Sequence, residues 1–109
     1  MRQLPFPLSV LRSGWGVPEI GRGLPATFAE GTEVMDQRLK HLFPVGSPEQ
    51  DMTRELERQG FRRSAAHNGV EFLDFTRSEL ITQTHWSIRW RALEGRITEI
   101  RGIYGCTAP

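Results

Sequence analysis

Residues 84–91 alternate between large or apolar side chains and polar ones, and this pattern constrains the fold more than any other feature of the sequence. Thr84, Trp86, Ile88 and Trp90 fall on one side of an extended chain, and the residues between them are polar. An antiparallel strand with one face in a core and the other in water has this period. The pattern therefore predicts a strand whose sheet is packed on one side.

The same strand is predicted to continue into a hairpin. Leu93-Glu94-Gly95 is typical of a three-residue loop with Gly95 in the left-handed conformation, and a second strand is expected over residues 96–104. This loop would place Trp90 opposite Thr98. The same register gives further expected pairs: Ile88 with Ile100, Trp86 with Gly102, Thr84 with Tyr104 and, on the other face, Arg89 with Glu99 as an opposite-charge pair.

Two shorter strands are predicted before it, at residues 61–64 and 70–76, on either side of a turn at His67-Asn68-Gly69. Phe72 and Leu73 are neighbours in the second of these strands and must point to opposite faces. Two explanations stay open at this point. Either both faces of the sheet are covered, or an apolar patch is exposed for a partner.

Two helices are predicted ahead of the strands. Residues 28–42 have a helical apolar period, with a capping box at Thr27 and Glu30 and a second candidate N-cap at Thr32, and we expect the later start. Residues 48–59 form the second helix, with Ser47 as the N-cap and Gly60 ending it in a Schellman motif.

The predicted fold class is α+β, with two N-terminal helices packed on one face of a three- to four-stranded antiparallel β-meander. Residues 27–109 are expected to form this single domain, and residues 1–26 a Pro/Gly-rich N-terminal arm. The expected core pairs apolar residues of the sheet with apolar residues of the helices, namely Trp86, Ile88, Trp90 and Ile100 with Val34, Leu39, Met52 and Leu56.

Composition excludes several functional classes. The formal net charge of the 109 residues is +1, which gives no overall field toward nucleic acid or membrane. The one cysteine, Cys106, permits no internal disulfide, and no apolar stretch reaches the length of a membrane span. No signal peptide or lipobox is recognised, so the expected location is cytoplasmic by default and periplasmic if a signal segment has been removed.

No catalytic, cofactor-binding or metal-binding residue is predicted. The three histidines, His41, His67 and His85, lie outside the spacings of metal motifs, and no nucleophile elbow, P-loop or dinucleotide fingerprint is present. Glu71 and Asp74 fall on opposite faces of their strand, so they do not form a carboxylate pair. No cofactor is expected, and we favour a non-enzymatic role over a small enzyme with an unrecognised site.

The expected role is protein binding, as an inhibitor, an immunity-type protein or an envelope-assembly partner. The predicted contact residues are aromatic, histidine and arginine side chains of the arm and the outer sheet face: Trp15, His85, Arg89, Arg91 and Arg101. A homodimer through the arm, with Phe6, Leu11 and Trp15, is a second arrangement that fits. Nucleic-acid binding is less expected because Glu99 lies among the arginines.

A family resemblance supports this role. The stretch from Val45 to Gly60, VGSPEQDMTRELERQG, with the Trp-x-Ile-x-Trp strand and the Gly95-Arg96-Ile97 hairpin, resembles the small domains of the BamE (SmpA/OmlA) family and the β-lactamase-inhibitor-protein repeats. It covers roughly residues 30–105. The resemblance implies two helices beside a three-stranded antiparallel sheet, and a protein that acts by binding other proteins.

Overall fold

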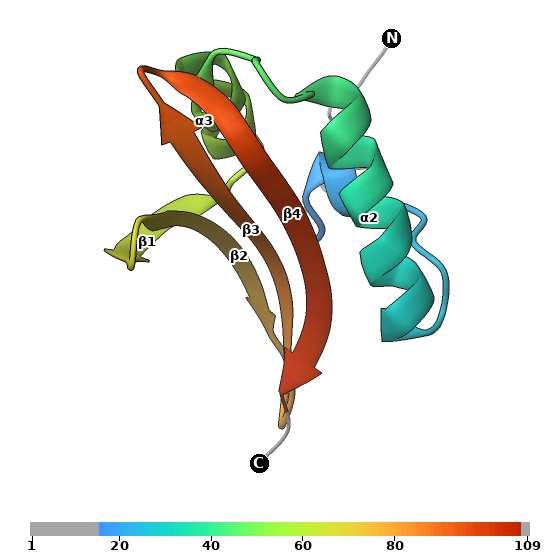
Figure 1. Cartoon of the computed structure of the whole chain (residues 1–109). Coiled ribbons are helices and arrows are strands. Elements are labelled where there is room, and N and C mark those ends of the chain that lie inside the picture. Colours follow the sequence, from blue (N-terminus) through green and yellow to red (C-terminus); the bar gives the residue numbers. More distant parts are fainter. Residues whose placement is uncertain (1–15, 108–109) are drawn as a thin grey trace, which may run out of the picture.

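The computed structural model describes residues 16–107, which form an α+β fold with a four-stranded antiparallel sheet of order β1-β2-β3-β4 (Figure 1). The elements follow one another along the chain as η1 (Glu19–Gly21), α2 (Phe28–Leu42), α3 (Glu49–Arg58), β1 (Arg62–His67), β2 (Val70–Ser78), β3 (Gln83–Leu93) and β4 (Arg96–Thr107). The prediction of an α+β fold with an antiparallel sheet is confirmed. No helix in the described part of the chain is both long and apolar enough to cross a bilayer.

Both outer hairpins turn on two residues with positive φ. In the β1–β2 hairpin these are Asn68 at 52° and Gly69 at 78°, and in the β3–β4 hairpin they are Glu94 at 53° and Gly95 at 79°. Two left-handed residues define the turn whose twist matches that of the flanking strands. The predicted three-residue loop at 93–95 is therefore wrong, because Leu93 already pairs with Arg96.

The pairing of β3 with β4 differs from the prediction by two residues. A bulge next to Arg91 follows the tight turn, and beyond it Trp90 lies opposite Ile100 and Ile88 opposite Gly102. A shift of two residues keeps every side chain on its predicted face, since side chains alternate with a period of two. The buried face of β3 was thus predicted correctly, while its cross-strand neighbours were not.

One core cluster holds apolar residues from both helices and from the sheet. Its buried apolar members are Ile20, Met35, Leu39, Met52, Leu56, Phe61, Leu73, Trp86, Ile88, Trp90, Ile97 and Ile100. Val34, expected in this core, is only half-buried. Met35 is buried instead, because the row of α2 that faces inward runs through residues 31, 35 and 39. The Schellman end of α3 is confirmed, with Gly60 at φ 108° and the Phe61 N–H donating to the Leu56 carbonyl at 3.1 Å.

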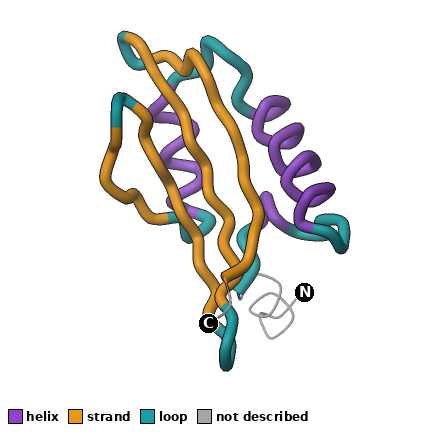
Figure 2. Tube along the Cα trace, turned by 60° about the horizontal axis from the view of Figure 1, so that its bottom comes forward, coloured by secondary structure: helices purple, strands orange, loops and turns teal. Residues whose placement is uncertain are grey.

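Helix α2 starts at the earlier of the two candidate positions. The Thr27 hydroxyl accepts the Glu30 N–H at 3.2 Å, so Thr27 is the N-cap and the expected later start is wrong. Thr32 has another role, because its hydroxyl donates to the Tyr104 carbonyl at 3.0 Å and accepts the Tyr104 N–H at 2.9 Å. These bonds hold α2 beside the edge strand β4 (Figures 1 and 2).

A second side chain of α2 extends this cover of the sheet edge. The Asp36 carboxylate accepts the Gly102 N–H at 2.9 Å, one turn along the helix from Thr32. An uncovered edge strand is a template for unwanted pairing, and side chains that use its backbone groups remove that hazard. The middle and end of β4 are therefore tied to α2 over residues 102–104.

The linker between the helices covers the start of β4. Ser47 was predicted as the N-cap of α3, but the cap position is Pro48, without a side-chain hydrogen bond. The Ser47 hydroxyl donates to the Pro44 carbonyl at 2.6 Å, and its own carbonyl accepts the Ile97 N–H at 2.9 Å. The Ser47 hydroxyl is therefore bonded within the linker and does not cap α3.

The described part of residues 1–26 lies against the helices. Pro18 and Ile20 are buried, and the Ile20 N–H donates to Gln59 Oε1 at 2.9 Å. Arg38 of α2 donates to the Ile20 carbonyl at 2.9 Å. Trp15, with Phe6 and Leu11, lies outside the described residues.

Candidate functional site

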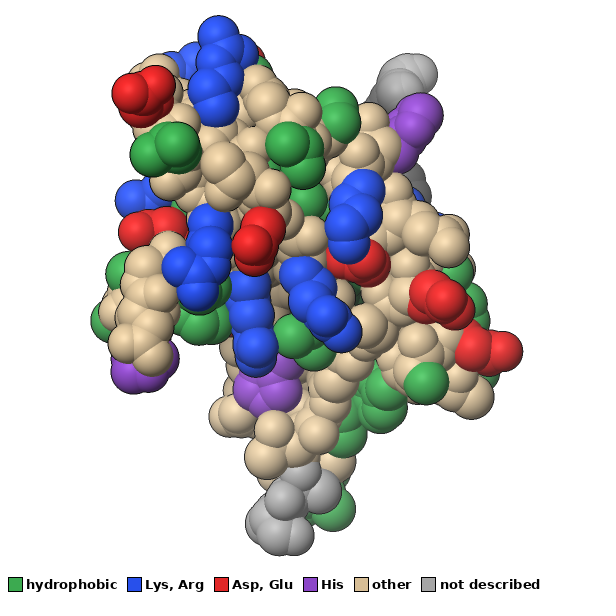
Figure 3. All heavy atoms as spheres, in the orientation of Figure 1, with side chains coloured by type: hydrophobic (Ala, Val, Ile, Leu, Met, Phe, Trp, Pro, Cys, Tyr) green, Lys and Arg blue, Asp and Glu red, His purple; other side chains and the backbone are tan. Residues whose placement is uncertain are grey.

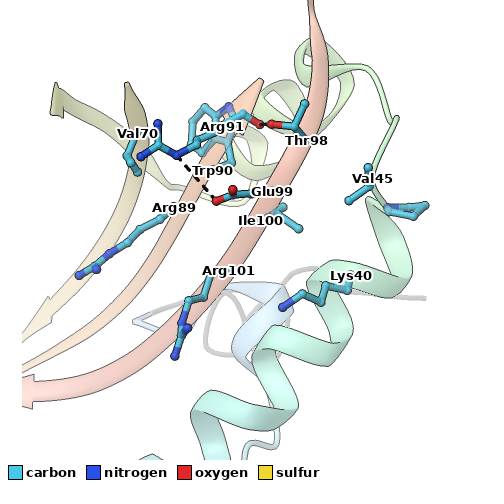
Figure 4. Close-up of a pocket in the computed structure, with 11 residues that line it drawn as sticks. Lys40, Val45, Val70, Arg89, Trp90, Arg91, Thr98, Glu99, Ile100 and Arg101 are labelled. Atoms are coloured by element: carbon cyan, nitrogen blue, oxygen red, sulfur yellow. Dashed lines mark hydrogen bonds and ion pairs between the residues drawn. The ribbon is translucent and has the colours of Figure 1, made fainter. Parts of the chain in front are cut away.

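A hollow of about 720 Å³ lies between the C-terminal end of α2 and the middle of β3 and β4 (Figure 4). We call it the β4 hollow. It is lined by residues of α2, the linker after it and three strands: Lys40, Pro44, Val45, Val70, Arg89, Trp90, Arg91, Thr98, Glu99, Ile100 and Arg101.

The lining combines apolar groups with positive charge. Val45 stands at its margin with 69% of its surface exposed, a large fraction for an aliphatic side chain, and Val70 lies on the other side of it. Of the described residues that line the hollow, four are basic and Glu99 is the only acid. Figure 3 shows the Lys and Arg side chains gathered over this face. The hollow therefore offers apolar surface inside a positive field.

Two of the arginines are cross-strand neighbours without a counter-charge. Arg89 and Arg101 are directly paired across β3 and β4, where the sequence predicted Arg89 opposite Glu99. Neither guanidinium forms an ion pair with a described residue, and Arg89 lies 5.5 Å from the centre of the Phe72 ring. Like charges directly opposite each other in a sheet are destabilising.

The other two cations of the hollow each have an acidic neighbour. Arg91 Nε lies 3.7 Å from Glu99 Oε1, which is a long, exposed ion pair. The Lys40 ammonium is bonded to Asp36 of the same helix. Within the hollow, Arg89 and Arg101 are therefore the cations that have no acidic partner among the described residues.

The structure brings together three of the five predicted site residues. Arg89, Arg91 and Arg101 line the hollow, whereas His85 lies farther along the same sheet face and is absent from the lining. His85 Nδ1 is 3.3 Å from Thr76 Oγ1 and its Nε2 is 2.9 Å from Thr107 Oγ1. Its cross-strand neighbour is Gly105. The fifth residue, Trp15, is not among the described ones.

Sequence reasoning missed the residues that complete the hollow from the helix side. Lys40 was placed in the first predicted helix, and Val45 was named only as the first residue of the stretch that carries the family resemblance. An exposed valine in a short linker is the one available signal for Val45. For Lys40 the sequence carries no signal, because the hydrogen bonds from Thr32 and Asp36 to β4 are what bring α2 next to the sheet edge.

Asp74, on the same sheet face, is bonded to two serines and not to a histidine. Asp74 accepts from Ser64 Oγ at 2.7 Å and from Ser87 Oγ, so both carboxylate oxygens are bonded to hydroxyls and neither is bonded to a histidine. A nucleophile–base–acid relay needs the acid on the histidine. In the described part of the chain, no group of His, Cys, Asp or Glu is placed to hold a metal ion.

One carboxyl group has a strongly shifted pKa, and it lies on α3, away from the hollow. Hydrogen bonds from Arg58, at 2.7 Å and 3.0 Å, lower the pKa of Glu55 to about 2, and Gln59 adds a further bond at 2.8 Å. Arg58 also donates to Glu19 of η1 at 2.9 Å. This cluster joins η1 to α3 and is structural.

Comparison of the chain with protein-family models, with curated proteins and with solved structures gives no match.

Proposed function

We propose that this chain is a non-enzymatic protein-binding module and that the β4 hollow is its partner site. The observation that carries the proposal is the combination of two aliphatic side chains, the exposed Val45 and the half-buried Val70, with four cationic side chains in one concavity. Protein interfaces combine an apolar centre with a polar rim and are enriched in Arg.

The composition of the core supports this placement. Apolar residues of α2 and α3, such as Leu39 and Leu56, share one core with Trp86 and Ile88 of β3. This is what packing of both helices on one face of the sheet would produce. The other face, which carries Arg89 and Arg101, then remains available to a partner.

The functional groups in the hollow favour binding over catalysis. Guanidinium groups are donors that stay charged throughout the physiological range, so they do not serve as general acids or bases. The carboxylate of Glu99 is already close to Arg91. Inhibition, immunity and envelope assembly are all roles that such a binder could serve, and the resemblance to BamE-like and β-lactamase-inhibitor-like domains favours the same class.

The experiment compares partner capture by three forms of the full chain: wild type, Val45→Asp and Leu80→Asp. Each variant places a carboxylate on an exposed aliphatic position, and Leu80 lies in the β2–β3 turn, outside the hollow. We expect one protein to be recovered from native lysate by wild type and Leu80→Asp and lost with Val45→Asp. Equal recovery by all three forms would show that the hollow is not the partner site.

A further inference from the structure

The unpaired charge of the hollow defines what its occupant must supply. Arg89 and Arg101 repel each other across the strands and have no acidic partner among residues 16–107. The arrangement costs stability in the free protein. A bound carboxylate between the two guanidinium groups would remove this repulsion and gain charge-assisted hydrogen bonds.

The β4 backbone has a donor and an acceptor at the strand edge that borders the hollow. Gly102 and Tyr104 point their N–H groups away from β3, toward α2. Antiparallel strands alternate in this respect, so Ile100, two residues earlier, also points its N–H and C=O out of the sheet edge. Ile100 lines the hollow, between the stretch covered by Ser47 and the stretch covered by Asp36. An extended chain segment is the ligand that uses both groups at once.

Neither of the two occupants that this chain could supply fits. Residues 1–15 contain Arg2 and Arg12 and no acidic residue, so their charge has the wrong sign for the hollow. A second copy placed face to face would bring two Arg89–Arg101 pairs together, and such an arrangement is repulsive. Charge complementarity therefore points to a different protein.

We infer that the β4 hollow binds an extended acidic segment of a partner protein. The segment runs beside β4 with its main chain on Ile100. One carboxylate lies between Arg89 and Arg101, and a neighbouring aliphatic side chain packs on Val45. This inference rests on the proposed function, and it adds the chemistry and conformation of the partner.

The test is an NMR titration of the isotope-labelled full chain with defined probes. The first probe is the peptide Glu-Val-Glu-Val-Glu-Val, the second is Lys-Val-Lys-Val-Lys-Val, and the third is an oligothymidylate of equal negative charge. We expect saturable shifts with the acidic peptide that include the Ile100 amide, and slower hydrogen exchange at that amide. Binding should weaken by about tenfold or more in Arg89→Gln/Arg101→Gln, since a close charge pair is lost.

The matched control is Arg54→Gln/Arg62→Gln, which removes two exposed arginines outside the hollow and should leave the affinity unchanged. Equal binding of the lysine peptide, tighter binding of the oligonucleotide, or an acidic peptide that binds equally to both double variants would overturn the inference. If these results occur while Val45→Asp still abolishes partner capture, the proposed function stands and only the acidic occupant is wrong. If Val45→Asp leaves capture unchanged, the proposed function itself fails.

Discussion

Replacing Gly102 with alanine should destabilise the protein, because α2 approaches β4 too closely for a side chain there. An ideal Cβ at this position would lie 2.6 Å from Leu39 Cδ1, 3.2 Å from Met35 Cγ and 3.4 Å from the Asp36 backbone nitrogen. Carbon atoms in contact are normally about 3.5–4.0 Å apart, so the end of the buried Leu39 side chain would have to shift by about 1 Å, and Met35 by less. Overpacking of this kind costs about 1–3 kcal/mol.

Gly105→Ala is the matched control in the same strand. A Cβ at Gly105 meets no described heavy atom within 4 Å, and its φ lies outside the left-handed region. Alanine there should be neutral or should stabilise by about 0.4–1 kcal/mol through the unfolded state. Urea denaturation followed by circular dichroism measures both variants. The smallest expected difference in the free energy of unfolding between the two variants is about 1 kcal/mol. Free energies of unfolding that agree within about half a kcal/mol would refute the close packing of α2 on β4.

Three further predictions concern the core, a pH-dependent ion pair and the arginine pair. Ile88→Ala should lower the free energy of unfolding by about 2–5 kcal/mol, and a loss below about 0.5 kcal/mol in urea denaturation would contradict the core assignment. Glu55 should titrate at about pH 2 by NMR and return toward 4.5 in Arg58→Met. Because the pKa of Glu55 is lowered in the folded state, its pair with Arg58 stabilises the protein above about pH 4.5, and that stabilisation is lost as the pH falls to about 2. An unshifted pKa of Glu55 would refute this prediction. Arg101→Gln should raise the free energy of unfolding by about 0.2–1 kcal/mol by relieving the repulsion with Arg89, and a decrease would argue against that repulsion.

The faces of the sheet could be predicted from the sequence, whereas the register could not. The period of two in β3 assigns Trp86 and Ile88 to the core and Arg89 to the outside, whatever the pairing. The register depends on Glu94 adopting a φ of 53°, which residues other than Gly rarely do, and on a bulge at Arg91. Neither is marked by residue type. The resulting shift of two hid the Arg89–Arg101 pair, which is the central charge feature of the site.

The hollow itself depends on long-range contacts that the sequence pattern does not specify. Thr32 and Asp36 are ordinary polar residues of a helix until they bond the backbone of β4. These bonds bring Lys40 next to the sheet, and the backbone bonds of Gly46 and Ser47 with Ile97 do the same for Val45. Three of the predicted residues, Arg89, Arg91 and Arg101, therefore line the hollow from the sheet side, and the residues on the helix side were not among those predicted.

The most direct test of the account is site-specific photo-crosslinking in cells, with a benzophenone amino acid placed at position 45 or at position 80 of the full chain. Val45 borders the hollow and Leu80 does not, although both side chains are well exposed. If the hollow is the partner site, a crosslinked adduct of defined mass forms from position 45 and is absent from position 80. An adduct from position 80 alone, or the same adducts from both positions, would contradict the account.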